Sequence, residues 1–436
     1  MKSRLFKTNA SATFVPARFL NETEKTDGEV VVRPIYKQTI LGYGGAFTDA
    51  SASLYAKLDE KTKKEFIHLY FSKEGLGYNL GRVTIGSCDF STGMYDYAEK
   101  DDLSDFSLRH DEKAIIPMIK DALKETPLSL LASCWSPLAK WKDSKDKDHG
   151  GHLLKEHYPD HAEYMAKFVE GYRALGLPIV AMTIQNEPAA TQTWESCLYS
   201  PEEEAEMALL LKKRLPDTKI YIWDHNRDIM LERVNGSLSV PNAKEAVYGV
   251  AYHWYDGNKN AEIAKVKEAY PDLHILFTEG CVELLNLNKD DPSSAIGTFE
   301  NGRRYAENYI RDLNYGSEGF LDWNLLLDMN GGPNRVGNYC EAPILTDGES
   351  LHPTYSYYFI KHLSSFLRPG AKVMEVEAPE GVLAVAGKNQ DGSLALVLLN
   401  LKETKTLRLS LGKWEERIRL GQNEIISIEV EGEHLW

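Results

Sequence analysis

At 436 residues, the chain is long enough for a barrel-sized domain and a smaller companion. Its 50 Lys and Arg against 65 Asp and Glu give a net charge of −15, which disfavours nucleic acid and anionic membrane surfaces as partners. Without a run approaching 18 apolar residues or a signal-peptide core, the sequence as given predicts no integral membrane association and a cytoplasmic location. The oligomeric state is not determined by the sequence.

The cysteines are too scattered for a disulfide framework or a zinc site. None of the five forms a C-x-x-C pair, so we expect reduced thiols and no metal. The positions are Cys88, Cys134, Cys197, Cys281 and Cys340.

Eight short apolar runs, rich in β-branched and aromatic residues, recur along the first three quarters of the chain. Each ends in polar or glycine-containing residues, and amphipathic stretches follow most of them. Strands that alternate with helices predict a parallel sheet, and eight such units predict a (β/α)8 TIM barrel, here spanning residues 38–367. The predicted strands are Ile40–Ala46, Tyr78–Ile85, Leu128–Trp135, Ile179–Ile184, Lys219–Trp223, Tyr248–His253, His274–Thr278 and Gly319–Trp323.

Helices are predicted between these strands from apolar residues at helical spacing. Ser51–Phe71, Glu112–Leu123, His161–Leu175 and Pro201–Leu215 show this pattern. The last of them begins with Ser200 as N-cap, Pro201 at the first position and Glu203 three residues after the cap, which predicts a capping box.

The pattern changes after residue 367, where short alternating strands are separated by turn residues. Gly381–Ala386, Leu394–Leu399, Thr406–Leu411 and Glu424–Glu429 predict an antiparallel β-sandwich or open barrel over residues 368–436. We expect the N-terminal extension, residues 1–37, to contribute strands to this side domain.

Three further segments are interpreted as structural. The mixed charges of Lys140–Asp148 favour a solvated loop over one that borders a pocket. Gly44 and Gly45 predict a tight turn, as do Gly331 and Gly332, since neither pair fits a nucleotide-binding pattern.

Two glutamates follow barrel strands and form the strongest chemical signal. Glu187 lies in Thr-Ile-Gln-Asn-Glu-Pro after the fourth strand, and Glu279 lies in Leu-Phe-Thr-Glu-Gly at the end of the seventh. Strand ends of a barrel share one rim, and paired carboxyl groups about 5 to 5.5 Å apart cleave glycosidic bonds with retention. We expect one of these carboxyl groups to be the general acid/base and the other to be the nucleophile, whose charge raises the pKa of its partner.

Other polar and aromatic residues also close apolar runs, where a sugar pocket needs hydrogen-bonding groups and aromatic faces. Taken singly, each could equally be a core or structural residue. They are Asp49, Arg82, Asp89, Trp135, His225, His253, Tyr255, Trp323 and Asn324.

Taken together, the motifs resemble glycoside hydrolase family 30, most closely its glucosylceramidase-like branch. The resemblance spans about residue 38 to the C-terminus, in order. It rests on Gly42-Tyr-Gly-Gly-Ala-Phe-Thr-Asp49, Gly77-Tyr-Asn-Leu-Gly-Arg82, Ser87-Cys-Asp-Phe-Ser91, Thr183-Ile-Gln-Asn-Glu-Pro188, His253-Trp-Tyr255, Thr278-Glu-Gly-Cys281, Asp322-Trp-Asn-Leu325 and Gly331-Gly-Pro-Asn334.

The resemblance implies a retaining β-glycosidase without a metal or organic cofactor, acting on small or oligosaccharide β-glycosides. It also implies Glu187 as acid/base and Glu279 as nucleophile. Residues that match glycone-pocket positions are Arg82, Asp89, Trp135, Asn186, His253, Tyr255, Trp323 and Asn330.

One departure affects the sugar subsite. Lys140 stands where the family has an aromatic residue, and whether Trp141 replaces that residue is left open. A β-glucosidase or glucosylceramidase is the favoured specificity, and β-1,6-glucanase, β-xylosidase and β-fucosidase are alternatives. A carbohydrate-binding protein without turnover is a remote alternative, because both carboxylates are present. A barrel aldolase or sugar-phosphate isomerase would need a Schiff-base lysine or a phosphate loop, and the sequence shows neither.

Overall fold

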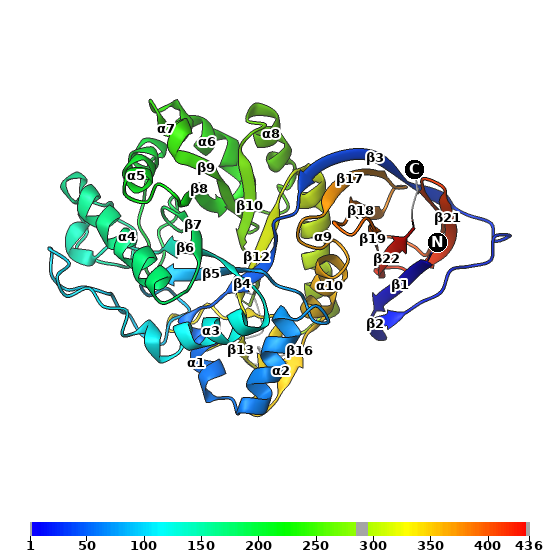
Figure 1. The fold of residues 1–436 in the computed structure, drawn as a ribbon, viewed down its shortest axis with the longest axis horizontal. Coiled ribbons are helices and arrows are strands. Elements are labelled where there is room, and N and C mark those ends of the chain that lie inside the picture. The colour runs from blue at the N-terminus through cyan, green and yellow to red at the C-terminus, as the bar shows by residue number, and fades with distance from the viewer. Residues whose placement is uncertain (1, 285–294, 433–436) are drawn as a thin grey trace.

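The computed structural model describes residues 2–284 and 295–432 and consists of a closed barrel beside a curled sheet (Figure 1). All eight predicted barrel strands are present and parallel, which confirms the predicted fold class. In barrel order they are β10 (His274–Glu279), β12 (Gly319–Asn324), β4 (Gly42–Ala46), β5 (Leu80–Ile85), β6 (Ser129–Cys134), β7 (Ile179–Thr183), β8 (Lys219–Asn226) and β9 (Val247–His253).

Helices surround the barrel and bury its outer face. Each helix contributes buried apolar residues to the hydrophobic core that covers the strands. A separate small core, which includes Leu131, Tyr221 and Leu321, fills the interior of the barrel. The helices are α1 (Asp49–Lys57), α2 (Glu60–Phe71), α3 (Ile115–Glu125), α4 (Tyr158–Ala174), α5 (Pro201–Arg214), α6 (Met230–Ser239), α7 (Ala243–Ala246), α8 (Ala261–Ala269), α9 (Phe299–Tyr315) and α10 (Tyr355–Ser364).

Two local predictions about this layer are tested by the structure. The capping box of α5 is confirmed, because Ser200 Oγ accepts from the Glu203 N–H while the Glu203 carboxylate accepts from the Ser200 N–H. The single helix predicted over Ser51–Phe71 is wrong. Leu58 is extended and Asp59 caps a new helix by accepting from the Thr62 N–H at 2.7 Å, so the segment forms α1 and α2.

Of the two glycine predictions, one is wrong and one is confirmed. Gly44 and Gly45 lie inside β4 rather than in a turn. A Cβ on Gly44 would stand 2.1 Å from the Leu80 carbonyl oxygen, so the close approach of the neighbouring strand requires glycine at this position. Gly331 does lie in a turn, with φ of +83°.

Strands from both ends of the chain build the side domain. β1 pairs with β22, and β3 joins β17 to β20, so the predicted composite of N- and C-terminal segments is confirmed as one nine-stranded curled sheet. The helices α9 and α10 lie between this sheet and the barrel (Figure 1). Its strands in order are β2 (Ala12–Pro16), β1 (Lys2–Asn9), β22 (Ile425–Glu431), β19 (Leu394–Asn400), β18 (Val382–Lys388), β17 (Lys372–Glu377), β3 (Gly28–Thr39), β20 (Lys405–Leu411) and β21 (Trp414–Leu420).

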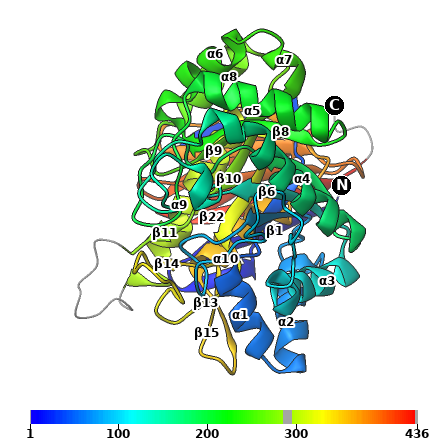
Figure 2. The ribbon, with the colours of Figure 1, turned by 90° about the vertical axis from the view of Figure 1, so that its left-hand side faces the viewer.

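Several short strands lie in the segments that follow β10 and β12. They form two small sheets beside the barrel (Figure 2). Their bounds are β11 (Val282–Glu283), β13 (Leu327–Asp328), β14 (Cys340–Glu341), β15 (Ile344–Thr346) and β16 (Leu351–Pro353).

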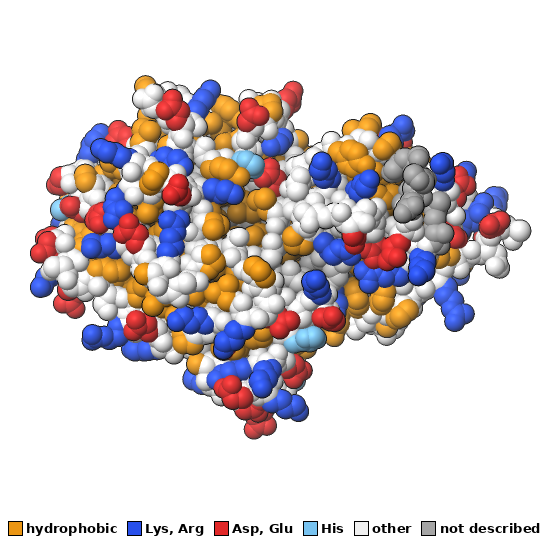
Figure 3. Space-filling view, in the orientation of Figure 1, with side chains coloured by type: hydrophobic (Ala, Val, Ile, Leu, Met, Phe, Trp, Pro, Cys, Tyr) orange, Lys and Arg blue, Asp and Glu red, His pale blue; other side chains and the backbone are white. Residues whose placement is uncertain are grey.

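The surface carries charges of both signs, and the cysteines form no disulfide bonds. Positive and negative side chains are interspersed over the face shown in Figure 3. All five cysteines are free and buried, as predicted. Within the described residues, no helix is both long and apolar enough to cross a membrane.

Candidate active site

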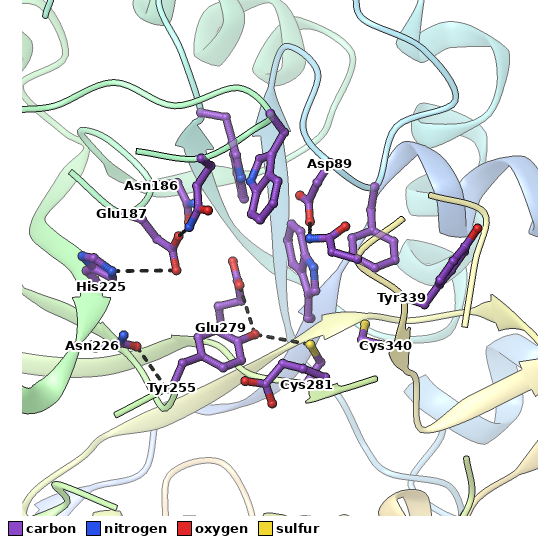
Figure 4. Close-up of a pocket in the computed structure, with 17 residues that line it drawn as sticks. Asp89, Asn186, Glu187, His225, Asn226, Tyr255, Glu279, Cys281, Tyr339 and Cys340 are labelled. Carbon is purple, nitrogen blue, oxygen red and sulfur yellow. Dashed lines mark hydrogen bonds and ion pairs between the residues drawn. The ribbon is translucent and has the colours of Figure 1, made fainter. Parts of the chain in front are cut away.

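A pocket of about 280 Å³ opens at the carboxyl ends of the barrel strands (Figure 4). Most of the residues predicted to bind a sugar line it, which brings together segments from Asp89 to Trp323. Those that do so are Asp89, Trp135, Asn186, Glu187, Tyr255, Glu279 and Trp323, joined by the weaker candidate His225.

The two glutamates face each other in this pocket. Glu279 is the last residue of β10, and Glu187 stands four residues beyond β7 with a positive φ of 49°, a conformation that a non-glycine residue adopts only where its surroundings hold it. The Glu187 N–H bonds to the Asp224 carbonyl oxygen at 3.0 Å. One carboxylate oxygen of each glutamate and a ring nitrogen of His253 all lie within 4.8 Å of one another.

Arg82 lies directly beneath the carboxylates and is fully buried. Its guanidinium donates to Glu279 at 2.7 Å, to Asn186 at 2.9 Å and to Asp224 at 2.8 Å. The same guanidinium lies 4.7 Å from the ring centre of Trp135. Arg82 therefore fixes three polar groups of the site and supplies the positive charge that Glu279 faces.

Asp224, at the end of β8, is a site residue that the sequence analysis missed. It accepts from Arg82, from Thr183 at 2.6 Å and from Thr278 at 2.5 Å, and it is fully buried. Burial alone would raise the pKa of Asp224, but the charge of Arg82 and the hydrogen bond with His253 lower it well below its usual value. Its place directly after an apolar run was the available signal.

His253 connects Asp224 to the acid/base candidate. Its Nε2 lies 3.0 Å from Asp224 Oδ1, and its Nδ1 lies 3.4 Å from Glu187 Oε1. Burial opposes the charge of the ring, but Glu279 and the two hydrogen-bonded carboxylates outweigh it and raise the pKa of His253 to about 9.

The contact between His253 and Glu187 contradicts one prediction. The charge of Glu279 led us to expect a raised pKa for Glu187. Burial does act in that direction, but the hydrogen bond with His253 and the nearby charge of His225 lower the pKa of Glu187 to about 2. The pKa of Glu279 is instead raised, mainly by burial. These directions favour a charged His253 beside an ionised Glu187.

Asp89 closes the opposite end of the pocket from His225 (Figure 4). Its carboxylate accepts from the Asn338 amide at 2.8 Å, and burial raises its pKa to about 7. Trp135 and Trp323 form the apolar part of this end, with their rings stacked 5.3 Å apart. Asn338, in the loop after β12, lines the pocket and is a second site residue that sequence reasoning missed.

The prediction for Asn330 is wrong. This residue is exposed in the turn after β13 and borders a separate cavity with Met329 and Tyr355. The turn places Asn338, eight residues later, beside Asp89 instead.

Two weaker candidates are structural. Asp49 accepts from Thr92 at the start of α1, and Asn324 accepts from Thr48 at 2.6 Å. Neither lines the pocket.

The segment that departs from the family pattern does not supply an aromatic face. Lys140 pairs with Asp101 at 2.7 Å, away from the pocket lining. Trp141 is fully buried and contacts His157 and Tyr164, so it does not replace the missing aromatic residue. Trp194, in the loop after β7, does line the pocket.

The reading of Lys140–Asp148 as a solvated loop is also wrong in part. Lys142 is buried and donates to the Ser196 carbonyl oxygen at 2.7 Å, and Lys147 is buried and donates to that of Tyr95 at 3.0 Å. These lysines tie together the loops that follow three strands.

Glu187, His253 and Glu279 also have the ligand types of a divalent-metal site. In this arrangement, however, both nitrogens of His253 are engaged by carboxylates and Glu279 is bound by Arg82. A cation would have to displace these interactions and would stand beside the guanidinium, so the donor set fits an acid–base pair better than a metal.

Known proteins are similar to this chain in sequence and in fold. Residues 40–367 match the glycosyl hydrolase family 30 TIM-barrel domain. Lysosomal acid glucosylceramidase of Mus musculus is 33% identical over 390 residues, covering 83% of this chain and 75% of that protein. Endo-1,6-beta-D-glucanase of Neurospora crassa is 26% identical, covering 84% and 79%.

Among solved structures, SrfJ from Salmonella typhimurium has a TM-score of 0.93 and 34% identity, covering 99% of this chain and 100% of that chain. The domain match covers most of the chain, and the paired glutamates of the pocket stand within it. This chain therefore belongs to glycosyl hydrolase family 30 and is a glycoside hydrolase.

Proposed function

We propose that the protein is a retaining β-glucosidase of the glucosylceramidase type. The observation that carries the mechanism is the spacing of the carboxylates, whose nearest oxygens lie within 4.8 Å. Retaining glycosidases hold their carboxyl groups about 5 to 5.5 Å apart, whereas inverting enzymes need about 6.5 to 9.5 Å to admit a water molecule.

Glu279 is the nucleophile in this proposal. Its two oxygens accept from Arg82 at 2.7 Å and from the Tyr255 hydroxyl at 3.1 Å, and both donors stabilise an ionised carboxylate. It attacks the anomeric carbon and forms a glycosyl ester while the bond to the leaving oxygen breaks.

Glu187 is the acid/base. A proton shared with His253 passes through Glu187 to the leaving oxygen. In the second step Glu187 takes a proton from water, the water oxygen bonds to the anomeric carbon, and the ester to Glu279 breaks. Arg82 and Asp224 hold both partners in place throughout.

A glucoside is the proposed substrate because the far end of the pocket presents Asp89 and Asn338 beside two tryptophan rings. A carboxylate and an amide there can bind the 4- and 6-hydroxyls of a hexose, and the apolar rings suit the sugar face. The glucosylceramidase among the relatives supports the same choice, and the endo-1,6-glucanase makes a β-1,6-glucan the alternative.

The test is a panel of nitrophenyl β-glycosides followed by gentiobiose and glucosylceramide. We expect the β-glucoside to be hydrolysed fastest and glucosylceramide faster than gentiobiose, with NMR showing the β-anomer of glucose as the first product. Formation of the α-anomer would contradict retention, and a preference for xylosides or fucosides would contradict the sugar.

A further inference from the structure

Beyond Asp89, four loops of the barrel mouth are joined by ion pairs behind the pocket wall. Glu195 accepts from the Ser87 hydroxyl with one carboxylate oxygen and from Arg335 with the other. The same guanidinium also pairs with Asp148 at 3.3 Å. The Glu195 side chain is fully buried, and that of Arg335 is 19% exposed.

The four residues follow four different strands. Ser87 follows β5, Asp148 follows β6, Glu195 follows β7 and Arg335 follows β12. In the ring of eight strands, β12 and β7 are four positions apart and therefore stand on opposite sides of the barrel. The Arg335–Glu195 pair thus crosses the mouth over the half that contains β4, β5 and β6.

Three residues of this link, Glu195, Ser87 and Arg335, are each close in sequence or hydrogen-bonded to a residue that lines the pocket. Glu195 follows Trp194, Ser87 precedes Asp89 by two residues, and Arg335 donates its backbone N–H to the Asp89 carbonyl oxygen at 3.4 Å. The loop is also held from the inside, since Asn338 donates to the Asp89 carboxylate. Loops after β6 and β7 are joined as well, because Ser196 donates to the Lys147 carbonyl oxygen at 2.9 Å.

We propose that the Arg335–Glu195 link closes the pocket beyond Asp89 and restricts the enzyme to single terminal glucosyl units. This inference rests on the proposed function. A second sugar attached to the 6-hydroxyl of the bound glucose would have to occupy the space that the link and the Asn338 loop fill. The other end, lined by Gln192, His225 and Asn226, accepts the leaving group.

The link consists of partly buried charges, so its loss should destabilise this wall of the pocket and change the products more than the folding. Arg335 has two carboxylate partners, and removing its guanidinium leaves Glu195 buried without a cation. The loop after β12 then loses its tie to the loop after β7 while its contact with Asp89 through Asn338 stays.

The first experiment uses the wild-type protein with nitrophenyl β-glucoside and its 6-O-benzyl derivative. We expect the substituted glucoside to be hydrolysed at least 100-fold more slowly. Hydrolysis of both within tenfold would overturn the closure while leaving the glycosidase function intact. Failure to hydrolyse any β-glucoside, with turnover of another glycoside, would instead contradict the proposed function.

The second experiment compares Arg335→Ala with wild type on gentio-oligosaccharides. Wild type should release glucose alone as the initial product, and the variant should raise the ratio of gentiobiose to glucose at least tenfold. Arg214→Ala is the matched control, because Arg214 also pairs with two carboxylates, Glu163 and Glu170, but on the outer face of the barrel.

Thermal melting shows whether Arg335→Ala is folded, and Glu195→Gln tests the same link without deleting a side chain. Unchanged products from either folded variant, or gentiobiose as the main initial product of wild type, would overturn the proposal.

Discussion

Two arginines of the barrel, Arg82 and Arg227, are each buried between two carboxylates, yet the two clusters differ in what lies beyond them. Arg227 pairs with Asp256 and Asp312, whose side chains are completely inaccessible to solvent. Arg82 pairs with Asp224, which is equally inaccessible, and with Glu279, whose side chain is 10% exposed in the pocket.

The difference separates a structural charge cluster from a reactive one. Asp312 is completed by Asn260 at 2.7 Å and by the Tyr252 hydroxyl at 2.9 Å, so every charge around Arg227 has protein partners. Around Arg82, Glu279 and Glu187 turn toward the pocket and can react with a bound molecule. Variants in the two clusters should therefore separate activity from stability.

The largest effect is expected for Glu279→Gln. Loss of the nucleophile should lower kcat by roughly four decades or more, because covalent catalysis and charge stabilisation both disappear. Arg82 then keeps one carboxylate, Asp224, and the replaced side chain borders the open pocket, so the melting temperature should fall less than in the fully enclosed Arg227 cluster. Mass spectrometry after a 2-fluoro glycoside should find the label on Glu279 in wild type. Activity within tenfold of wild type would rule out this residue.

Glu187→Ala should come next, with a loss of about 10²- to 10⁴-fold on poor leaving groups. Dinitrophenyl glycosides need little acid assistance, so their first step should be spared while the second stalls. Azide needs no base and should restore turnover with a β-glycosyl azide as product. No rescue, or the α-azide, would contradict a retaining acid/base role for Glu187.

In the other cluster, Asp312→Asn should destabilise the fold by about 3–5 kcal/mol, since it leaves the buried Arg227 with one carboxylate. Activity of the folded fraction should be close to that of wild type. Urea unfolding and active-site titration measure the two quantities separately. Glu60→Gln is the control, because it removes a surface pair with Lys63 worth roughly 1 kcal/mol or less. A large loss of kcat in folded Asp312→Asn would remove the distinction between the clusters.

Asp89→Ala addresses sugar selection at the pocket end. Loss of a buried hydrogen-bonding partner costs about 1–3 kcal/mol, so kcat/KM for the glucoside should fall roughly 5- to 150-fold. The xyloside lacks the 6-hydroxyl and should lose much less. Asn338→Ala should act in the same direction, because Asn338 holds the Asp89 carboxylate. Equal losses on both sugars would show that Asp89 does not bind the 6-hydroxyl.

The sequence was sufficient for the barrel and for both glutamates because these signals are local. An apolar run shows where a strand ends, and the residues directly after it show what faces the rim. Asp224 was missed although it fits that rule, since His225 beside it was chosen instead. Asn338 and Arg335 could not be found this way, because their partners lie 249 and 140 residues distant. The direction of the pKa shift of Glu187 was misjudged because it depends on a hydrogen bond with His253, which lies 66 residues away in the sequence.

The smallest effect is expected for the pH dependence of kcat/KM, which should change little near neutral pH. The pKa of His253 is raised to about 9, above its ordinary value, so its proton is present at low and neutral pH and is lost as the pH rises through about 9. The stability contributed by His253 follows the same sign, fully present below about 6.5 and lost through the same alkaline range. Because Glu187 draws its proton from this histidine, kcat/KM should be level around neutral pH and fall near pH 9.

His253→Gln tests this assignment directly. Without the ring, Glu187 loses the hydrogen bond that lowers its pKa most, so burial and the charge of Glu279 should raise that pKa. The alkaline limb of kcat/KM should then move to lower pH, while Asp224 keeps Arg82, Thr183 and Thr278 as partners. A profile of kcat/KM from pH 5 to 10 for the two proteins measures the shift. If the limb stays where it is in wild type, the donated proton does not come from the Glu187–His253 pair, and His253 only positions Glu187.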